Sequence, residues 1–387
     1  MAERLSFQRD SNDENRRKKD KVLQSWGLPE DILFNILMRL PTLLIFDLRL
    51  VCKSWYNLIT DPVFIETLLS RSNAGLIFQV QISSSSYLTN FMEIKHGELW
   101  VHYLGLDCPG RIRGSCNGLI LLESMLNIFV FNPMTNQQTM LPPSDMPYKY
   151  PLSFEIYGFG YNSRTKEYKV VHICEYKKKM SPHPLACEIT TVGSGSWREI
   201  NGPFFGLAEL HVPVSANGVL HWATERDYII SMDVGNEKFC RTPFPNCSRK
   251  CYYLLDLSES LSFADHTLPF QIDVWVLKDL NKGEWIKQYS VSVERFANFL
   301  SKDWTWNGTL DQVVILGSFL NGEIIIIENY AVNGTEFYMC DLKLNQSFQI
   351  PEVCGILLIS LDTWSSPIHV NSLETWQPRI SQRWVGV

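Results

Sequence analysis

The densest group of potential metal ligands in the sequence is Cys240, Cys247 and Cys251, with His266 fifteen residues beyond the last of them. Thiolates and imidazoles are good zinc ligands, and a structural zinc site needs four of them, usually as closely spaced pairs. No second pair follows at a suitable distance, and His266 stands alone. This pattern favours free thiols, so we predict no metal site.

A reactive thiol at Cys108 or Cys116 is a second possibility, because Arg111 and Arg113 lie between them. A basic neighbourhood lowers the pKa of a thiol and makes it a better nucleophile. We prefer to interpret these residues as ordinary strand-end positions. They therefore give no catalytic nucleophile.

The remaining candidates do not form a catalytic arrangement. His172 and His221 fall within apolar, strand-like segments and are expected to be core histidines with satisfied hydrogen bonds. The Gly-Ser-Gly at 193–195 is too short for a dinucleotide-binding loop, and the sequence contains no Walker-type loop and no Gly-x-Ser-x-Gly motif. We predict no catalytic residue and no cofactor, and we expect the chain not to be an enzyme.

Composition narrows the possible partners and the compartment. The 387 residues carry a net charge of −6 and a pI of about 5.8, which is not the basic signature of a nucleic-acid-binding protein. The first twenty residues lack the apolar core of a secretory signal, and no apolar stretch reaches the ~18 residues of a membrane helix. The basic cluster at 16–21 fits a nuclear import signal or, preferably, a solvated tail. We expect a cytoplasmic or nuclear location, free thiols, and neither nucleic acid nor membrane as partner.

The helical part of the chain precedes the strands. Residues 1–24 are polar and charged, which predicts a disordered tail. Residues 25–70 show helical periodicity, with apolar residues every four positions from Leu28 to Leu40. We expect Pro41 to end that helix. Nearly every residue at 43–48 is apolar, which is more than a unit of about 45 residues can bury. Either a protein partner or the rest of the chain must cover the excess, and we favour a partner.

From residue 74 onward the sequence alternates with a period of two, which predicts short strands. The clearest are Gly75–Ile82, Leu119–Glu123, Ile128–Asn132, Tyr168–Tyr176, Gly218–Thr224, Tyr228–Asp233, Ile272–Lys278, Val313–Leu320 and Gly322–Glu328. Asn-Gly dipeptides at 117–118, 217–218 and 321–322 predict hairpins, because both residues tolerate positive φ. A short helix is possible at 294–304.

A weak repeat runs through these strands. A strand, polar turn, strand unit recurs near 132, 191, 233, 279 and 341, so 209 residues divide into four steps of about 52. Gly-x-Trp occurs in two such turns, at 195–197 and 283–285. Steps of this size suit four-stranded propeller blades, about six of them, and we prefer that architecture to an irregular sandwich. Residues 364–387 show no obvious strand that would close a blade.

The segment LPEDILFNILMRLPTLLIFDLRLVCKSWYNLITDPVF, residues 28–64, resembles an F-box in its Leu-Pro-Glu-Asp opening, its Leu-Pro at 40–41 and its Val-Cys-Lys-Ser-Trp at 51–55. F-boxes dock on the Skp-family adaptor of a ubiquitin ligase built on a cullin scaffold. The resemblance implies that the adaptor-facing surface is formed or supported by Leu28, Pro29, Ile32, Ile36, Leu37, Leu40, Pro41, Leu44, Leu48, Val51 and Trp55. One departure is that Leu43 and Leu44 stand where many relatives carry Lys-Ser, which should make the surface more apolar.

The strand region resembles the F-box-associated interaction domain of plant F-box proteins, a family related to kelch-repeat F-box proteins. The resemblance rests on GSCNGLILL (114–122), FVFNPMT (129–135) and YGFGYNSRTKEYKVVHI (157–173), and it covers most of residues 75–370. It implies an α+β multidomain chain, with a helical F-box at 25–70, an all-β propeller-like domain at 74–373 and a C-terminal tail at 374–387.

Together the two resemblances imply the substrate-recognition subunit of a Skp–cullin–F-box ubiquitin ligase. Its partners would be a Skp-family adaptor, through it a cullin scaffold, and an unknown protein substrate. Two alternatives stay open: a propeller enzyme with a metal or ligand at the central channel, and an F-box scaffold without ubiquitination. The long connections that we expect to contact the substrate are 142–152, 177–186, 202–213, 243–251 and 294–310.

Overall fold

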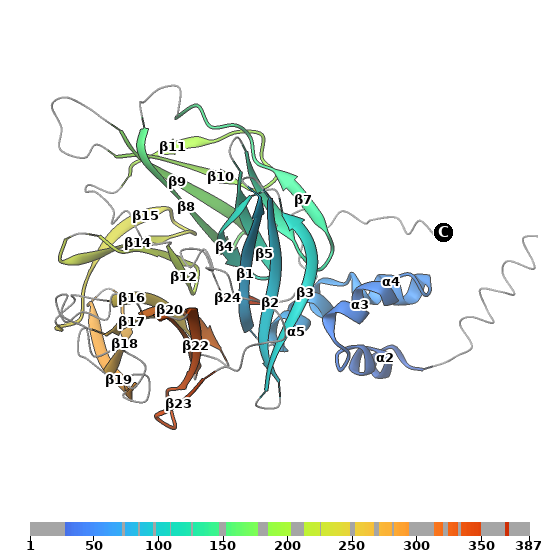
Figure 1. Ribbon diagram of the computed structural model, residues 1–387. Coiled ribbons are helices and arrows are strands. Elements are labelled where there is room, and N and C mark those ends of the chain that lie inside the picture. Colours follow the sequence, from blue (N-terminus) through green and yellow to red (C-terminus); the bar gives the residue numbers. More distant parts are fainter. Residues whose placement is uncertain are drawn as a thin grey trace, which may run out of the picture. The chain divides into compact units, whose positions relative to one another are not determined.

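The computed structural model describes residues 28–71, 74–83, 86–95, 98–108, 110–124, 127–146, 152–176, 185–202, 213–224, 226–247, 252–266, 271–280, 282–293, 313–319, 324–331, 334–349 and 368–370. The chain divides into two compact units, Met1–Leu68 with Trp384–Val387 and Leu69–Arg383. Figure 1 labels the helices and strands in both. The predicted tails at 1–24 and 374–387 and the possible helix at 294–304 lie outside the described residues.

The N-terminal region consists of the short helices α2 (Glu30–Leu37), α3 (Thr42–Leu48), α4 (Lys53–Ile59) and α5 (Pro62–Arg71) (Figure 1). Proline fixes two of the starts: Pro29 and Pro41 precede α2 and α3 with φ of −49° and −57°, values that the ring imposes and a helix start needs. The sequence predicts that Pro41 ends the first helix. That helix ends earlier, at Leu37, and Pro41 instead precedes the next helix. Among the described residues, no helix is long and apolar enough to cross a membrane.

The helices share a small apolar core. Leu37, Ile45 and Phe64 are fully buried, and the rings of Phe34 and Phe64 meet edge to face at 5.2 Å. On α2 the core face carries Leu33 and Leu37, one position after the residues of the four-residue repeat. The repeat itself is therefore not the inward stripe of this helix.

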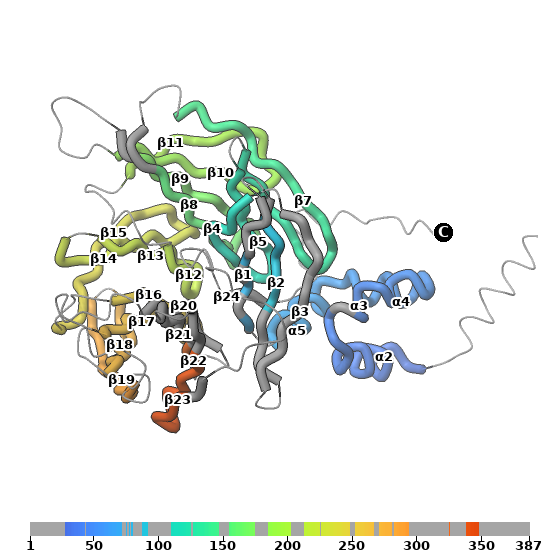
Figure 2. The backbone as a smooth tube through the Cα atoms, viewed as in Figure 1, coloured from blue at the N-terminus to red at the C-terminus, as the bar shows by residue number. Residues whose placement is uncertain are grey.

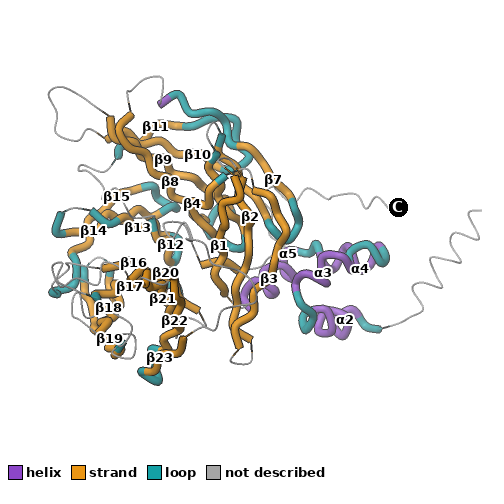
Figure 3. The backbone as a smooth tube through the Cα atoms, viewed as in Figure 1, coloured by secondary structure: helices purple, strands orange, loops and turns teal. Residues whose placement is uncertain are grey.

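Beyond the helices, almost all described regular structure is β-strand (Figure 3). The described strands form six antiparallel four-stranded sheets. The first contains β24 (Ile368–Val370), β1 (Ala74–Ser83), β2 (Ser86–Lys95) and β3 (Glu98–Cys108). The second contains β4 (Arg111–Cys116), β5 (Leu119–Glu123), β6 (Ile128–Asn132) and β7 (Gln137–Met140). The third contains β8 (Leu152–Asn162), β9 (Glu167–Tyr176), β10 (Leu185–Thr191) and β11 (Arg198–Ile200).

The other three sheets repeat this order. The fourth contains β12 (Val214–Ala216), β13 (Val219–Trp222), β14 (Tyr228–Asp233) and β15 (Lys238–Pro243). The fifth contains β16 (Tyr252–Leu257), β17 (Ser260–Asp265), β18 (Gln271–Asp279) and β19 (Glu284–Ser292). The sixth contains β20 (Val313–Phe319), β21 (Ile324–Ala331), β22 (Gly334–Asp341) and β23 (Gln346–Gln349). Three predicted strands agree with β5, β6 and β14 at both ends.

The sheets close into a ring through one end strand of each. Contacts run from β24 to β4, then through β8, β12, β16 and β20, and from β20 back to β24. Figure 2 follows the chain around this ring in colour order from β4 to β19. The closing strand β24 pairs with β1, Ala74 facing Val370, although residues 364–387 gave no sign of a strand. The domain is thus propeller-like, and its ring joins strands from both ends of the domain.

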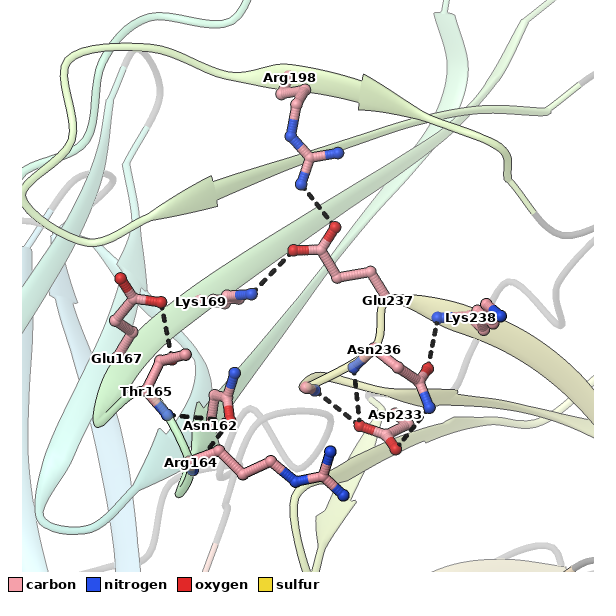
Figure 4. A network of polar contacts seen from close by, with 11 residues as sticks. Asn162, Arg164, Thr165, Glu167, Lys169, Arg198, Asp233, Asn236, Glu237 and Lys238 are labelled. Atoms are coloured by element: carbon pink, nitrogen blue, oxygen red, sulfur yellow. Dashed lines mark hydrogen bonds and ion pairs between the residues drawn. The ribbon is translucent and has the colours of Figure 1, made fainter.

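The hairpins follow from their turn residues. At 117–118 and 217–218 both residues of the Asn-Gly dipeptide have positive φ, as a two-residue hairpin turn requires. The third predicted dipeptide, at 321–322, lies outside the described residues. A four-residue turn recurs after β6, β8, β14 and β22, and in each the Asn or Asp before the turn accepts main-chain N–H bonds, as Asp233 does in Figure 4. The predicted marks at 132, 191, 233, 279 and 341 all fall at the turn between the third and fourth strands of a sheet.

Candidate functional site

The predicted adaptor-facing residues occupy three different environments in the helical unit. Leu28, Ile32, Ile36, Leu44 and Val51 are exposed, with values from 43% for Ile36 to 59% for Val51. Pro29 and Pro41 are also exposed, and the half-buried members are Leu40, Leu48 and Trp55. Leu37 is fully buried and can only support the surface from beneath.

The exposed residues of α2 share one side because of their spacing. Leu28, Ile32 and Ile36 are four residues apart, and residues at that spacing lie above one another on a helix. Leu33 and Leu37 occupy the adjacent side and pack into the core. The helix is therefore apolar on two neighbouring sides, one of which is left in contact with solvent.

The apolar segment at 43–48 distributes its side chains in a similar way. Ile45 enters the core completely, whereas Leu44 stays more than half exposed. The guanidinium of Arg49 lies 3.5 Å from the centre of the Phe46 ring and covers it. Burial lowers the pKa of Arg49. The side chain of Leu43 lies outside the described residues.

Two further exposed apolar residues escaped the motif-based prediction. Leu50 is 65% exposed in the turn after α3, and Val63 is 64% exposed in the first turn of α5. Neither stands at a position that the quoted motif elements mark. Only their accessibility identifies them, and sequence periodicity does not give that.

The residues considered for metal binding do not converge in the described part of the chain. Cys240 is exposed on β15, Cys247 is half-buried, and His266 is buried after β17 with its ring stacked on Tyr253. Cys251 lies outside the described residues. Within the ranges that the structure describes, no three His, Cys, Asp or Glu side chains are grouped so that they could hold a metal ion.

The two strand histidines are both buried and hydrogen-bonded, as predicted. His221 Nδ1 lies 2.8 Å from Ser231 Oγ, and burial lowers the pKa of His221 to about 3, so its ring is neutral. His172 instead contacts two carboxylates, those of Glu188 and Glu155. Of the two thiols beside arginines, Cys116 is half-buried at the end of β4, and the side chain of Cys108 is not described. Arg113 is paired with Glu123.

The predicted substrate-contacting connections leave the β unit from one end. In an antiparallel sheet the connections after the second and fourth strands emerge at the same edge, opposite the hairpins after the first and third. The connection at 177–186 follows a second strand, and those at 142–152, 202–213, 243–251 and 294–310 follow fourth strands. The described residues of these segments are 142–146, 152, 185–186, 202, 213 and 243–247. The tight turns therefore occupy the opposite end.

Comparison with known proteins gives two family matches. Residues 71–355 match the F-box associated beta propeller domain, and residues 26–67 match the F-box domain. From Arabidopsis thaliana, F-box protein At3g07870 is 26% identical, over 78% of this chain and 82% of its own length. F-box protein CPR1 is 27% identical over 68% and 73%, and F-box/kelch-repeat protein At3g23880 is 25% identical over 76% and 86%. The exposed apolar residues thus lie in the F-box domain, and the β domain matches the F-box associated beta propeller domain.

Proposed function

We propose that this chain, which belongs to the F-box proteins with an F-box associated beta propeller domain, is the substrate-recognition subunit of a Skp–cullin–F-box ubiquitin ligase. The observation that carries the proposal is the set of exposed apolar side chains on the F-box helices. They include Leu28, Ile32, Ile36, Leu44 and Val51. Exposed apolar surface of this extent on a small unit marks a protein-binding site.

Burial of these side chains supplies the driving force for docking. Removing an aliphatic side chain of this size from water is worth about 1.5–3 kcal/mol when it is exposed beforehand, and half of that for partial exposure. At half of that range, five such residues together contribute about 4–7.5 kcal/mol. This is comparable to the lower part of the range estimated for the entropic cost of association, roughly 4–15 kcal/mol. The partner is a Skp-family adaptor, which the F-box match implies, and a cullin scaffold joins through that adaptor.

Leu37 and Trp55 have a different part in this docking. Leu37 has no exposed surface, so it positions Ile36 by fixing the rotation of α2 about its axis. Trp55 lies in α4 and is half-buried, so part of the residue is accessible to a partner. We assign contact roles to the exposed and half-buried residues of the predicted set and a supporting role to Leu37.

The β unit holds the target protein in this proposal. The long connections gather at one end of the ring, and loops on a rigid scaffold are the usual place for recognition. The chain then acts through proximity, because it raises the concentration of target lysines near the ubiquitin-conjugating enzyme. Such a role needs no catalytic residue in this chain.

Reconstitution with purified components tests the proposal. The full chain, a Skp-family adaptor and a cullin scaffold should elute together in size-exclusion chromatography, and Ile32→Asp should remove the chain from that complex. Leu344→Asp is the matched control, because Leu344 is also an exposed aliphatic residue, at 65% against 44% for Ile32, and lies in the turn before β23. Proteins retained by the β unit should gain ubiquitin when the complete ligase is added. Co-elution of the Ile32→Asp variant at wild-type yield contradicts the proposal.

A further inference from the structure

The β unit contains a buried ionisable cluster that the proposed function does not use. His172, in the middle of β9, has no exposed surface. Its Nδ1 lies 2.8 Å from Glu188 Oε1 on β10, and its Nε2 lies 3.2 Å from Glu155 Oε2 on β8. The Tyr157 ring stacks on the imidazole at 4.4 Å, and its hydroxyl donates to Glu155 Oε2 at 3.3 Å. One histidine therefore connects carboxylates from both neighbouring strands.

The geometry of this cluster determines its proton count. An ionised carboxylate can only accept hydrogen bonds, so each of the two contacts requires an N–H on the ring. A neutral imidazole has one N–H, and an imidazolium has two. With both glutamates ionised, His172 is therefore the doubly protonated cation. Burial lowers the pKa of His172, but the hydrogen bonds to Glu155 and Glu188 outweigh it and raise that pKa overall.

The cluster faces the seam between the second and third sheets. Tyr157 packs in the apolar cluster that contains Leu121 and Val130 of the second sheet. From that sheet the charge of Arg113 acts on Glu155, and the charge of Glu123 acts on Tyr157.

The remaining groups around His172 come from its own sheet. Cys174, two residues along β9, is close enough that Glu188 and Glu155 contribute to raising the pKa of its thiol to about 12, after burial as the main cause. The Trp197 ring meets His172 edge-on at 6.0 Å, and its indole donates to the carbonyl oxygen of Pro142 at 2.7 Å. The titratable groups around the histidine are thus Glu155, Tyr157, Cys174 and Glu188, and the charges of Arg113 and Glu123 act on Glu155 and Tyr157.

We propose that Glu155, His172 and Glu188 form a proton-dependent latch that holds strands β8, β9 and β10 of the third sheet together. The shared proton on His172 orders the two glutamates, one on each neighbouring strand. Loss of that proton leaves a ring nitrogen lone pair facing a carboxylate, which is repulsive. The Glu188 side chain is 4% exposed, and that of Glu155 is 37% exposed.

The direction of the pH dependence follows from the two shifts. The pKa of His172 is raised from 6.5, so its contribution is complete below about 6.5 and is lost as the pH rises through the folded-state value. The pKa of Glu155 is lowered from 4.5, chiefly by the hydrogen bond from His172. Its contribution is therefore complete above about 4.5 and is lost as the pH falls through its folded-state value. The latch is strongest in mildly acidic to neutral solution and weakens on the alkaline side.

A nitrogen-15 NMR titration of the full chain labelled at histidine tests the latch without altering the protein. The chain has eight histidines, and we expect one to keep both ring nitrogens protonated to a higher pH than the ordinary value of about 6.5. In Glu188→Gln that signal should convert to the neutral form at a lower pH than in the wild type, because one charged partner is removed. A wild-type chain in which no histidine titrates above about 6.5 overturns the proposal.

Hydrogen exchange tests the consequence for the third sheet. Amides of β8 to β10 in the full chain should lose protection between about pH 6 and pH 8.5, after correction for intrinsic exchange, by up to roughly tenfold for each pH unit between about 6.5 and the folded-state pKa of His172. Glu188→Gln should make this loss smaller, because it brings the folded-state pKa of His172 closer to its ordinary value. His221→Gln is the control, since His221 is buried but neutral throughout that range, and it should leave the pH profile unchanged. Equal protection at both pH values in the wild-type chain contradicts a latch.

Discussion

The indole Nε1 of Trp285 donates a 2.7 Å hydrogen bond to the carbonyl oxygen of Pro243, across the seam between the fourth and fifth sheets. Trp197 makes the same bond at the same distance to Pro142, across the seam between the second and third sheets. Each tryptophan stands at the start of a fourth strand, and each proline stands at or just after the end of the preceding sheet's fourth strand. The Gly-x-Trp repeat of the sequence is thus a repeated link between sheets.

The two glycines of this repeat should respond differently to substitution. A Cβ at Gly283 would lie 2.3 Å from Pro243 Cγ, and the residue has φ of +63°. A Cβ at Gly195 would meet nothing within 4 Å. We expect Gly283→Ala to lower the free energy of unfolding by about 2 kcal/mol through clash and strain, and Gly195→Ala to change it by less than about 0.5 kcal/mol. Chemical denaturation of both variants measures this, and equal stabilities would argue against the close approach of Gly283 to Pro243.

The ion pairs around Glu237 give a second contrast (Figure 4). Glu237 accepts from Lys169 Nζ at 2.8 Å and is also paired with Arg198. The Lys169 side chain is only 9% exposed, whereas that of Arg198 is 60% exposed. Because Glu237→Gln leaves a buried ammonium without its counter-charge, we expect it to cost about 2 kcal/mol or more. Arg198→Gln removes only an exposed partner and should cost under about 1 kcal/mol.

Measurement at low pH adds a check on Glu237. The lysine and arginine lower its pKa against the effect of burial, so the pair stabilises the fold above about 4.5 and is lost as the pH falls through the folded-state value. The difference in stability between wild type and Glu237→Gln should therefore shrink in acid. A difference that stays constant down to about pH 3 would refute the assignment of this loss to the carboxylate charge.

Asp256 should destabilise the native chain in alkaline solution. Burial, with help from the nearby charge of Glu259, raises the pKa of Asp256 to about 7. A carboxyl with a raised folded-state pKa costs nothing below its ordinary pKa of about 3.8, and its cost to folding grows as the pH rises from there to about 7. We expect Asp256→Asn to raise the melting temperature at about pH 8.5 and to have little effect near pH 3.5. Thermal unfolding at both values decides, and a variant that melts lower at about pH 8.5 disproves it.

Neighbouring residues of α2 separate docking from folding. Ile36 is 43% exposed, and Leu37 has no exposed surface. Leu37→Ala should leave a cavity that costs about 2–5 kcal/mol and unfolds the small helical unit. Ile36→Asp should leave its helicity and melting unchanged and weaken adaptor binding. Circular dichroism and adaptor pulldown on both variants distinguish the two effects, and loss of helicity in Ile36→Asp would place that residue in the core.

Much of this architecture is present in the sequence because local chemistry determines it. The Asn-Gly turns at 117–118 and 217–218 have the positive φ values that their residue types favour. Asn132 and Asp233 mark four-residue turns because their side chains accept main-chain N–H groups within the turn. The residues that determine these turns lie within the turns themselves. The hairpins and the repeat could therefore be predicted from the sequence.

The remaining features depend on contacts that no local pattern encodes. The pKa of His172 is raised because Glu155 and Glu188 face it from two other strands, and only the strand register brings the three together. The strand β24 has three residues and acquires its structure by pairing with β1, almost 300 residues earlier in the chain. On α2 the four-residue spacing indicated an apolar side correctly but not which of two adjacent apolar sides faces the core. Long-range packing decided each of these.

Calorimetric titration of the full chain with a purified Skp-family adaptor measures directly whether α2 takes part in docking. We expect dissociation constants at or below about 1 μM for the wild-type chain and for Leu344→Asp, and at least tenfold weaker binding, ~1.4 kcal/mol, for Ile36→Asp. Binding of Ile36→Asp with the wild-type affinity would contradict this expectation, because the exposed apolar side of α2 would then have no part in docking.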